Sequence, residues 1–483
     1  MQRTAVRALI VTAALVATGM TAGPPAAAQE EPVAHFVVLA RKGAPLARTE
    51  ASVRDAGGHV VRSWPQIGVV VATSPDAGFA AAVRPLPGVV AAGATRDLVE
   101  LAGAPPAAKS STVDGRVTPA AAEPLAENQW SMRQIRADQA NEISGGSRDV
   151  VVGVLDYGVE ATHPDLAPNI DASRSFGCGD EGIPDTSPGA WDTLPGFFPH
   201  GVAVAGIIAA ARNGVGIAGV APNVRIASVR MADSDGFIYP EHVICGYVWA
   251  ADHGIDVTNA SWTADPWVRW CDEDPDQAAG LEAMRRAIDY AADRGVVNVA
   301  AIGNANWDLS HPVLDDISPD NGEPMERLTG DNCQQVPAEV PGVVTVSGIG
   351  AEERKARNSN YGIRDVDVTA ASGDVDQFPG TGEDNPGVLT TLSGGQWGYF
   401  GGTSAAAPHV AGVVALIRST HPGWSPTHVV AALERQADRL PCPPGGVYDP
   451  DGTGAWLAHC QGGRSGQGFY GHGLVDALDA VTR

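Results

Sequence analysis

The sequence predicts an α/β fold in which helices cover both faces of a mostly parallel central sheet, with a small α+β domain in front of it. Three observations predict this architecture. From about residue 128 onward, short continuous apolar runs alternate with helical segments, which is typical of strands buried on both faces. Residues 33–100 carry a separate pattern of strands and helices. Residues 101–127, rich in Ala, Pro, Ser and Thr, separate the two parts as a flexible linker.

The small first domain is expected to follow the order β-α-β-β-α-β, a ferredoxin-like pattern. Gly57 and Gly58 should end its first helix. Ser74 and Pro75 should start its second helix, as N-cap and first-turn residue. The elements are expected at His35–Ala40 (strand), Ala44–Ala56 (helix), His59–Trp64 and Ile67–Thr73 (strands), from Ser74 (helix) and from Val89 (strand).

The larger second part should contain six buried strands and five helices. The strands are expected at Val150–Leu155, Arg225–Val229, Asp256–Ala260, Val296–Ile302, Val343–Val346 and Val366–Ala371. The helices are expected at residues 200–211, 240–253, 277–294, 404–419 and 425–437. In such an open sheet, functional residues gather beyond the carboxyl ends of the strands.

The first residues of the chain are typical of a secretory signal peptide. Arg3 and Arg7 precede an apolar run from Ala8 to Met20, and Ala26–Ala28 offers small residues for cleavage. A membrane anchor is the alternative, but the run is shorter than the about 20 apolar residues that span a bilayer. We therefore expect residues 1–28 to be removed and the protein to be secreted, extracellular and without a membrane anchor.

Charge and cysteine content exclude some functions. The chain has 56 acidic and 32 basic residues and a net charge of −24, so its surface repels phosphate and nucleic acid is not an expected partner. Six cysteines in an exported chain favour disulfides, and six cysteines allow 15 pairings. Cys442 with Cys460 is the favoured local pair. No Cys-x-x-Cys occurs, which argues against a zinc knot.

Three residues stand where catalysis could occur. Asp156 follows the strand that starts at Val150, and His200 opens a helix of small residues. Ser404 follows two glycines and also opens a helix, whose free N–H groups and partial positive charge favour an adjacent oxyanion. Taken alone, the Asp and the Ser could equally be structural caps. Together they supply a nucleophile, a base and a carboxylate that orients the base.

The order Asp156, His200, Ser404 and the segment Gly401–His409 (GGTSAAAPH) make the chain resemble the subtilisin-like serine proteases, the subtilases or peptidase family S8. The closing segment Gly471–Ala477 is also similar to that family. The resemblance implies a subtilisin-like three-layer fold and a serine endopeptidase that works through an acyl-enzyme without a catalytic cofactor. It implies protein or peptide substrates, a monomer and a zymogen that processes itself.

The resemblance also assigns roles to segments. Residues 29–100 would be a propeptide that assists folding and inhibits the enzyme, residues 101–127 a linker cut during maturation, and residues 128–483 the peptidase domain. Asn304 would be the oxyanion asparagine. Ser261, Trp262 and Thr263 would pair with the substrate backbone as an edge strand.

Some residues depart from the family pattern. Tyr157 follows the Asp, Val202 and Ala203 follow His200 and Gly201, and Thr263 replaces a usual glycine. The resemblance further implies a structural calcium, with Asp165 and Asn213 as ligands and carbonyls from the loop Arg212–Ile217, because calcium takes oxygen ligands. Two alternatives stay open: a catalytically silent binding protein of this family, and a dedicated maturation protease for one exported peptide.

Overall fold

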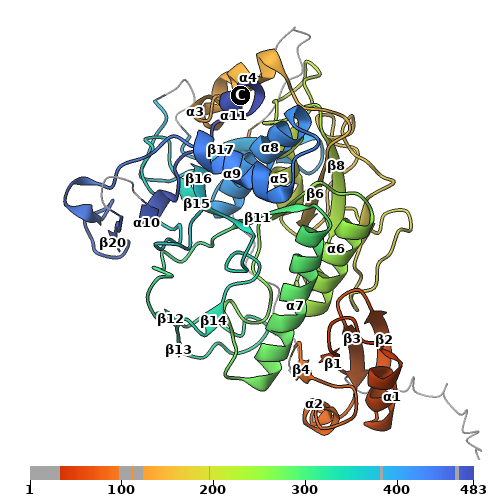
Figure 1. Cartoon of the computed structure of the whole chain (residues 1–483). Helices are drawn as coiled ribbons and strands as arrows, with labels where there is room; N and C mark the ends of the chain where they lie inside the picture. Colours follow the sequence, from red (N-terminus) through yellow and green to blue (C-terminus); the bar gives the residue numbers. More distant parts are fainter. Residues whose placement is uncertain (1–32, 97–110, 114–122, 195, 381–384, 463–466) are drawn as a thin grey trace, which may run out of the picture. The chain divides into compact units, whose positions relative to one another are not determined.

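A seven-stranded parallel sheet forms the centre of the molecule, in the order β16-β15-β11-β9-β6-β8-β7. The computed structural model describes residues 33–96, 111–113, 123–194, 196–380, 385–462 and 467–483 (Figure 1). The predicted signal peptide and most of the predicted linker lie outside these residues. The sheet strands are β6 (Val151–Asp156), β7 (Phe176–Gly177), β8 (Arg225–Arg230), β9 (Val257–Ala260), β11 (Val297–Ala301), β15 (Val344–Ile349) and β16 (Val368–Ala371).

Helices cover both faces of this sheet, as the continuous apolar strands predict. Val152 and Val154 of β6 belong to the same core as α5 and α8, whereas Val151 and Leu155 belong to the core that contains α6 and α7. The alternation follows from the period of two in a strand. The main helices are α5 (His200–Ala209), α6 (Pro240–Asp252), α7 (Pro275–Asp293), α8 (Thr403–Thr420) and α9 (Pro426–Gln436).

The N-terminal domain (residues 33–96) has the expected β-α-β-β-α-β order and an antiparallel sheet in the order β2-β3-β1-β4. The predicted start of the second helix at Ser74 is wrong. Ser74 is the last residue of a strand, and its hydroxyl accepts a hydrogen bond from the Asp76 N–H. The elements are β1 (Ala34–Leu39), α1 (Ala47–Asp55), β2 (His59–Trp64), β3 (Val69–Ser74), α2 (Phe79–Val83) and β4 (Ala91–Ala94).

The two faces of that small sheet bury different neighbours. Phe36 and Val38 pack with the domain's own helices, whereas Val37 and Leu39 share a core with residues of α6 and α7. Arg286 of α7 also donates to the Ala40 carbonyl at 2.8 Å. The N-terminal domain therefore completes its burial against these two helices.

The predicted linker is not irregular throughout. Residues Ser111–Val113 form β5, which pairs antiparallel with β18 (Gln396–Phe400), next to β17 (Val388–Leu392). Ala126–Asn128 forms a short 3-10 helix, η1. Thr and Val favour strands, so a nearby unpaired edge can recruit this segment.

The remaining helices and strands are short. They are α3 (Trp130–Gln134), α4 (Ala137–Ile143), β10 (Trp270–Cys271), β12 (Val313–Asp315), β13 (Arg327–Thr329), β14 (Cys333–Gln334), η2 (Pro444–Gly446), β19 (Val447–Tyr448), β20 (Ala458–His459), α10 (Gln467–Tyr470) and α11 (Ala477–Thr482).

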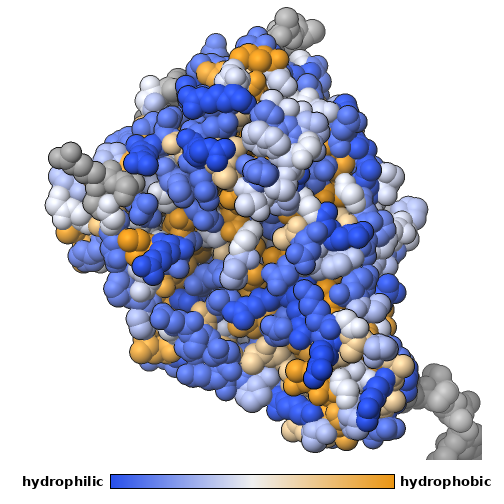
Figure 2. Space-filling view, viewed as in Figure 1, coloured by the Kyte–Doolittle hydropathy of each residue, from blue (hydrophilic) through white to orange (hydrophobic). Residues whose placement is uncertain are grey.

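All six cysteines are paired, which confirms the expectation of disulfides and the local pair Cys442–Cys460. The other two bridges are Cys178–Cys245 and Cys271–Cys333. Within the described residues, none of the helices has the length and apolar character needed to cross a bilayer. The face shown in Figure 2 is largely hydrophilic.

Candidate active site

Asp156 and His200 meet at the carboxyl end of the central strand β6. The Nδ1 atom of His200 lies 2.8 Å and 2.9 Å from the two carboxylate oxygens of Asp156. Asp156 is fully buried, and the Tyr157 N–H donates to its Oδ1 at 2.8 Å. Gly201 makes this approach possible, because a Cβ there would lie 2.3 Å from the Gly158 carbonyl oxygen.

Two aromatic rings hold the imidazole from the sides. The Tyr157 ring lies edge-on to His200 at 5.9 Å between centroids, and the Phe400 ring does so at 5.2 Å. The side chain of His200 is 17% exposed. The imidazole is therefore fixed by its carboxylate and two rings, yet its other edge stays accessible.

Ser404 lies in the first turn of α8, as the glycines before it predict. The helix begins at Thr403, with Gly402 as N-cap at a φ of 86°. The Ser404 hydroxyl donates to the Ser261 carbonyl at 3.1 Å, and the Ser261 hydroxyl donates to the Ser404 carbonyl at 3.1 Å. The Ser404 hydroxyl is thus engaged by the Ser261 carbonyl.

Asn304 lies beside the start of α8, just beyond β11. Its Oδ1 accepts from the Thr403 N–H at 2.8 Å and from the Asn358 amide at 3.3 Å. Because Oδ1 is held in this way, the amide orientation is fixed. The side chain is exposed. This leaves an N–H donor next to Ser404.

The segment Ser261–Thr263 follows β9, next to Ser404. The Trp262 side chain is 8% exposed, and its indole N–H donates to the Leu155 carbonyl beneath Asp156. The side chain of Trp262 therefore supports the end of β6, and its backbone is the part that could pair with a substrate. Thr263 is half-buried.

Comparison with known proteins identifies the family. A model described as the subtilase family matches residues 147–462. The chain belongs to the subtilase family. Fervidolysin of Fervidobacterium pennivorans is 30% identical over 328 residues, which cover 65% of this chain and 41% of fervidolysin. Subtilisin NAT of Bacillus subtilis subsp. natto is 30% identical over 312 residues, which cover 64% of this chain and 66% of that protein.

The aligned part of the chain thus spans less than two thirds of either relative. The structure of the epidermin leader peptide processing serine protease from Staphylococcus aureus matches with a TM-score of 0.71 at 22% identity, over 93% of this chain and 98% of that chain. This likeness shows a subtilisin-like fold.

The departures from the subtilase pattern are accommodated by packing. Val202 and Ala203 are fully buried, and their carbonyls accept hydrogen bonds from Thr391 and Thr390 of β17. Both side chains pack in the hydrophobic core, where apolar residues are suitable. The ring of Tyr157 contacts the ring of His200.

The residues of the expected calcium site come together only in part. Asp165 is fully buried, and its Oδ2 accepts from the Ile217 N–H at 3.0 Å and the Trp397 indole at 2.7 Å. Its Oδ1 has no partner among the described residues. Burial raises the pKa of Asp165 to about 7, and the Glu123 carboxylate adds to that rise.

Glu123 is a candidate ligand that sequence reasoning misses. Its Oε1 accepts from the Gly214 N–H at 3.2 Å, and its Oε2 is buried without a partner among the described residues. Asn213 turns its Oδ1 toward the Val215 N–H at 2.9 Å. Two carboxylate oxygens that lack a described partner lie beside the loop Arg212–Ile217, which turns the N–H groups of Gly214 and Ile217 toward these carboxylates. The described residues hold no cluster of three or more Asp, Glu, His or Cys around one point.

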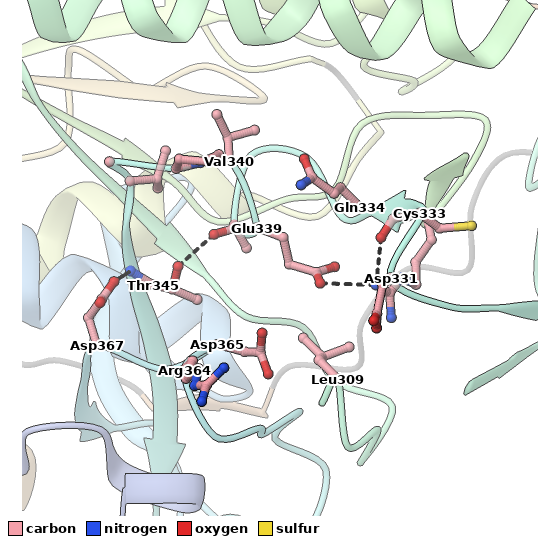
Figure 3. A pocket seen from close by; sticks show the side chains of 15 residues that line it. Leu309, Asp331, Cys333, Gln334, Glu339, Val340, Thr345, Arg364, Asp365 and Asp367 are labelled. Carbon is pink, nitrogen blue, oxygen red and sulfur yellow. Dashed lines mark hydrogen bonds and ion pairs between the residues drawn. The ribbon is translucent and has the colours of Figure 1, made fainter. Parts of the chain in front are cut away.

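Two cavities differ in their relation to this site. A groove of about 500 Å³ is lined by Asn304, Phe400 and Gly402, and Phe400 also contacts the ring of His200. A second cavity of about 380 Å³ is lined by Glu339, Asp365 and other polar residues (Figure 3). Burial raises the pKa of Glu339 to about 7 and that of Asp365 to about 6. No predicted site residue lines the second cavity.

Proposed function

We propose that this member of the subtilase family is a secreted serine endopeptidase that removes its own N-terminal domain. The observation that carries the proposal is the Asp156–His200 pair at 2.8 Å, next to a serine at a helix N-terminus and an exposed, oriented amide from Asn304. This set provides a base, a nucleophile and an oxyanion donor.

The reaction follows from these positions. The Ser404 hydroxyl rotates from the Ser261 carbonyl to Nε2 of His200, which takes its proton as Oγ attacks the scissile carbonyl carbon. The Asn304 Nδ2–H and the Ser404 backbone N–H hold the oxyanion. His200 then gives the proton to the leaving amine, and the C–N bond breaks to leave an acyl-Ser404. Water then attacks the acyl carbon as His200 takes its proton. His200 returns that proton to Oγ as the C–O bond to Ser404 breaks, and the acid is released.

Asp156 acts on His200 throughout. Its carboxylate fixes Nδ1 as the protonated nitrogen, so that Nε2 is free to accept the Ser404 proton. It also stabilises the imidazolium that forms after the transfer. Because Asp156 is fully buried, water weakens this charge interaction little.

The N-terminal domain serves in this proposal as inhibitor and folding aid. It packs on α6 and α7, and the chain beyond it leads into the predicted linker. A parallel sheet with distant strand pairings closes long loops before it gains contacts, so a template that docks on two of its helices favours folding. Cleavage between about residues 107 and 128 then frees the peptidase part.

A structural calcium is part of the proposal. Asp165, Glu123, Asn213 and carbonyls of the loop Arg212–Ile217 would hold the ion, and the two orphaned oxygens are the observation that supports it. The ion would neutralise the buried carboxylate of Asp165 and the half-buried one of Glu123 and would fix the loop, with no part in the chemical step.

The direct test is hydrolysis of casein by the mature protein. We expect cleavage that a serine-directed inhibitor abolishes and that the Ser404→Ala variant lacks. A wild-type protein that is folded, has lost its N-terminal domain and still cleaves nothing would support the silent binding protein instead.

A further inference from the structure

The first turn of α6 carries a carboxylate that solvent does not reach. Glu241 is 0% exposed, and neither of its oxygens has a hydrogen-bond partner among the described residues. Its partners within the described part of the chain are Arg96, at 3.1 Å, and His35, at 3.5 Å. Arg96 carries the positive charge of this group, because burial lowers the pKa of His35. Both partners belong to the N-terminal domain.

Arg96 occupies a pocket built for a guanidinium, here called the arginine pocket (Asp180, Asp233, Tyr239 and Glu241). Its guanidinium donates to the Asp180 carbonyl at 2.8 Å and lies 3.5 Å from the Asp233 carboxylate. The Tyr239 ring centroid lies 4.7 Å from its Cζ atom. A planar cation that can stack and meet two carboxylates matches this set better than an ammonium does.

The pocket is rigid and supplies no cation of its own. The Cys178–Cys245 disulfide ties the strand before Asp180 to α6, one turn beyond Glu241. His242 reaches the Asp180 carbonyl at 3.3 Å. Burial lowers the pKa of His242 to about 4, so this side chain is neutral at physiological pH.

The arginine pocket adjoins the triad through packed aromatic residues. The Tyr157 ring, edge-on to His200, stacks on Phe197 at 6.5 Å. Phe197 in turn fills the space over Gly236, where a Cβ would lie 2.4 Å from the ring. Asp233 belongs to the same loop as Gly236, and its carboxylate accepts a hydrogen bond from the Phe237 N–H.

The segment Ser261–Thr263, which is predicted to pair with the substrate, leads to the arginine pocket. Two residues after Thr263, Asp265 exchanges backbone and side-chain hydrogen bonds with Ile238, the residue before Tyr239. A peptide backbone that pairs with Ser261–Thr263 would therefore run toward the arginine pocket.

We propose that the arginine pocket binds an arginine side chain of the peptide substrate, upstream of the bond that is cut. The inference rests on the proposed function, because it needs the N-terminal domain to leave. When it leaves, Arg96 and His35 go with it, and Glu241 and Asp233 keep no cationic partner within the described residues. An unpartnered carboxylate in a pocket is unfavourable, and a substrate arginine restores the pair. Arg96 precedes the predicted cut by about 11 residues or more, so a substrate arginine that takes its place also lies N-terminal to the bond that is cut. The substrate reaches the pocket along Ser261–Thr263, so its arginine lies closer to that bond than Arg96 does.

The test uses the matured wild-type enzyme and fluorogenic peptides of fixed cut site. Arginine, lysine or norleucine is placed in turn at each position from two to eight residues upstream of the scissile bond. We expect one position at which arginine raises kcat/KM about tenfold over norleucine, with lysine between them, mainly through a lower KM. Glu241→Gln should remove most of this gain. Asp235→Asn, which deletes an exposed carboxylate of the same loop, should keep it.

The outcomes separate the two proposals. If the wild type cleaves no peptide, the proposed function fails. If it cleaves the norleucine peptides but gains nothing from arginine at any position, the arginine pocket is overturned while the protease stands. A gain that survives in both Glu241→Gln and Asp233→Asn would also overturn it. The wild-type scan needs no variant, so it tests the arginine pocket even if Glu241→Gln folds poorly.

Discussion

At the scale of single residues, the side chains that the sequence singles out by motif are brought together, but their orientation is not written in the motif. Asp156 and His200 pair directly, as their local contexts predict. The Ser404 hydroxyl instead donates to the Ser261 carbonyl, because the rotamer of a hydroxyl depends on neighbours that come from another strand.

Tyr157, which in the sequence is only a departure from the family pattern, is a neighbour of the His200 imidazole. Glu123 escapes prediction because it lies in a stretch whose composition is that of a linker.

Asn304 provides a residue-scale prediction. Asn304→Ala should lower kcat about 10²–10³-fold with little change in KM, because the donor binds charge that exists only near the transition state. Steady-state kinetics on one peptide measure both constants. Asn358→Ala is the matched control: it removes the 3.3 Å hydrogen bond to Asn304, but the Thr403 N–H still orients the amide, so kcat should change little. Wild-type kcat in Asn304→Ala would remove this residue from the site.

Calcium provides a second residue-scale prediction. In the inactive Ser404→Ala background, millimolar calcium should raise the melting temperature relative to chelator, because a ligand that binds only the folded state stabilises it by about 2.7 kcal/mol at one hundred times its Kd. Adding Asp165→Asn should abolish the response, and adding Asp185→Asn, an exposed carboxylate, should preserve it. Equal melting curves with calcium and with chelator in the Ser404→Ala protein would contradict the site.

At the scale of elements, ten of the eleven strands and helices predicted for the main domain begin and end within two residues of the predicted bounds, and β15 runs three residues past its predicted end. The strands β7, β17 and β18 are not among the predicted elements. Buried parallel strands are continuous apolar runs, so β6 and β8 are easy to locate. The Ser74-Pro75 pair misplaces the start of α2, because tertiary pairing extends β3 through Ser74 and overrides the cap signal. The strand β5 depends on pairing with β18, a contact between segments far apart in the sequence.

The helix α8 yields a prediction on acid stability. His409 is fully buried, its Nδ1 contacts the Ala405 carbonyl at 2.7 Å, and its Nε2 has no partner among the described residues. Burial lowers the pKa of His409 to about 4. Between about pH 6.5 and pH 4, His409 is therefore protonated in the unfolded chain and neutral in the folded chain. His409 therefore makes the free energy of unfolding fall as pH falls through that window, by up to about 1.4 kcal/mol per pH unit.

Denaturant unfolding of Ser404→Ala between pH 4.5 and pH 6 measures this slope. Adding His409→Gln should make the slope shallower. Adding His459→Gln, a substitution at an exposed histidine, should leave it unchanged. Identical slopes in all three proteins would show that His409 is not the residue that resists protonation.

At the scale of the whole molecule, the sequence predicts the fold class and the two-part organisation, but not how the parts meet. The apolar residues of β1 are consecutive, which favours burial on both faces of its sheet, yet which surface covers the second face follows only from the packing of Val37 and Leu39 with α6 and α7. Likewise, spacing singles out Cys442–Cys460, whereas Cys178–Cys245 joins residues 67 positions apart and needs the fold to be known.

The most direct measurement of whether Ser404 performs the proposed chemistry is the intact mass of the protein made with and without its hydroxyl. Wild type and Ser404→Ala are expressed from the full chain in the same protease-deficient host and purified as folded protein. We predict that the wild type is a shorter chain that starts within or just after the linker, between about residues 107 and 128, and that Ser404→Ala retains the N-terminal domain in covalent attachment. Ser404→Ala cut at the same position as the wild type would show that another protease does the cutting, and would leave Ser404 without its role in maturation.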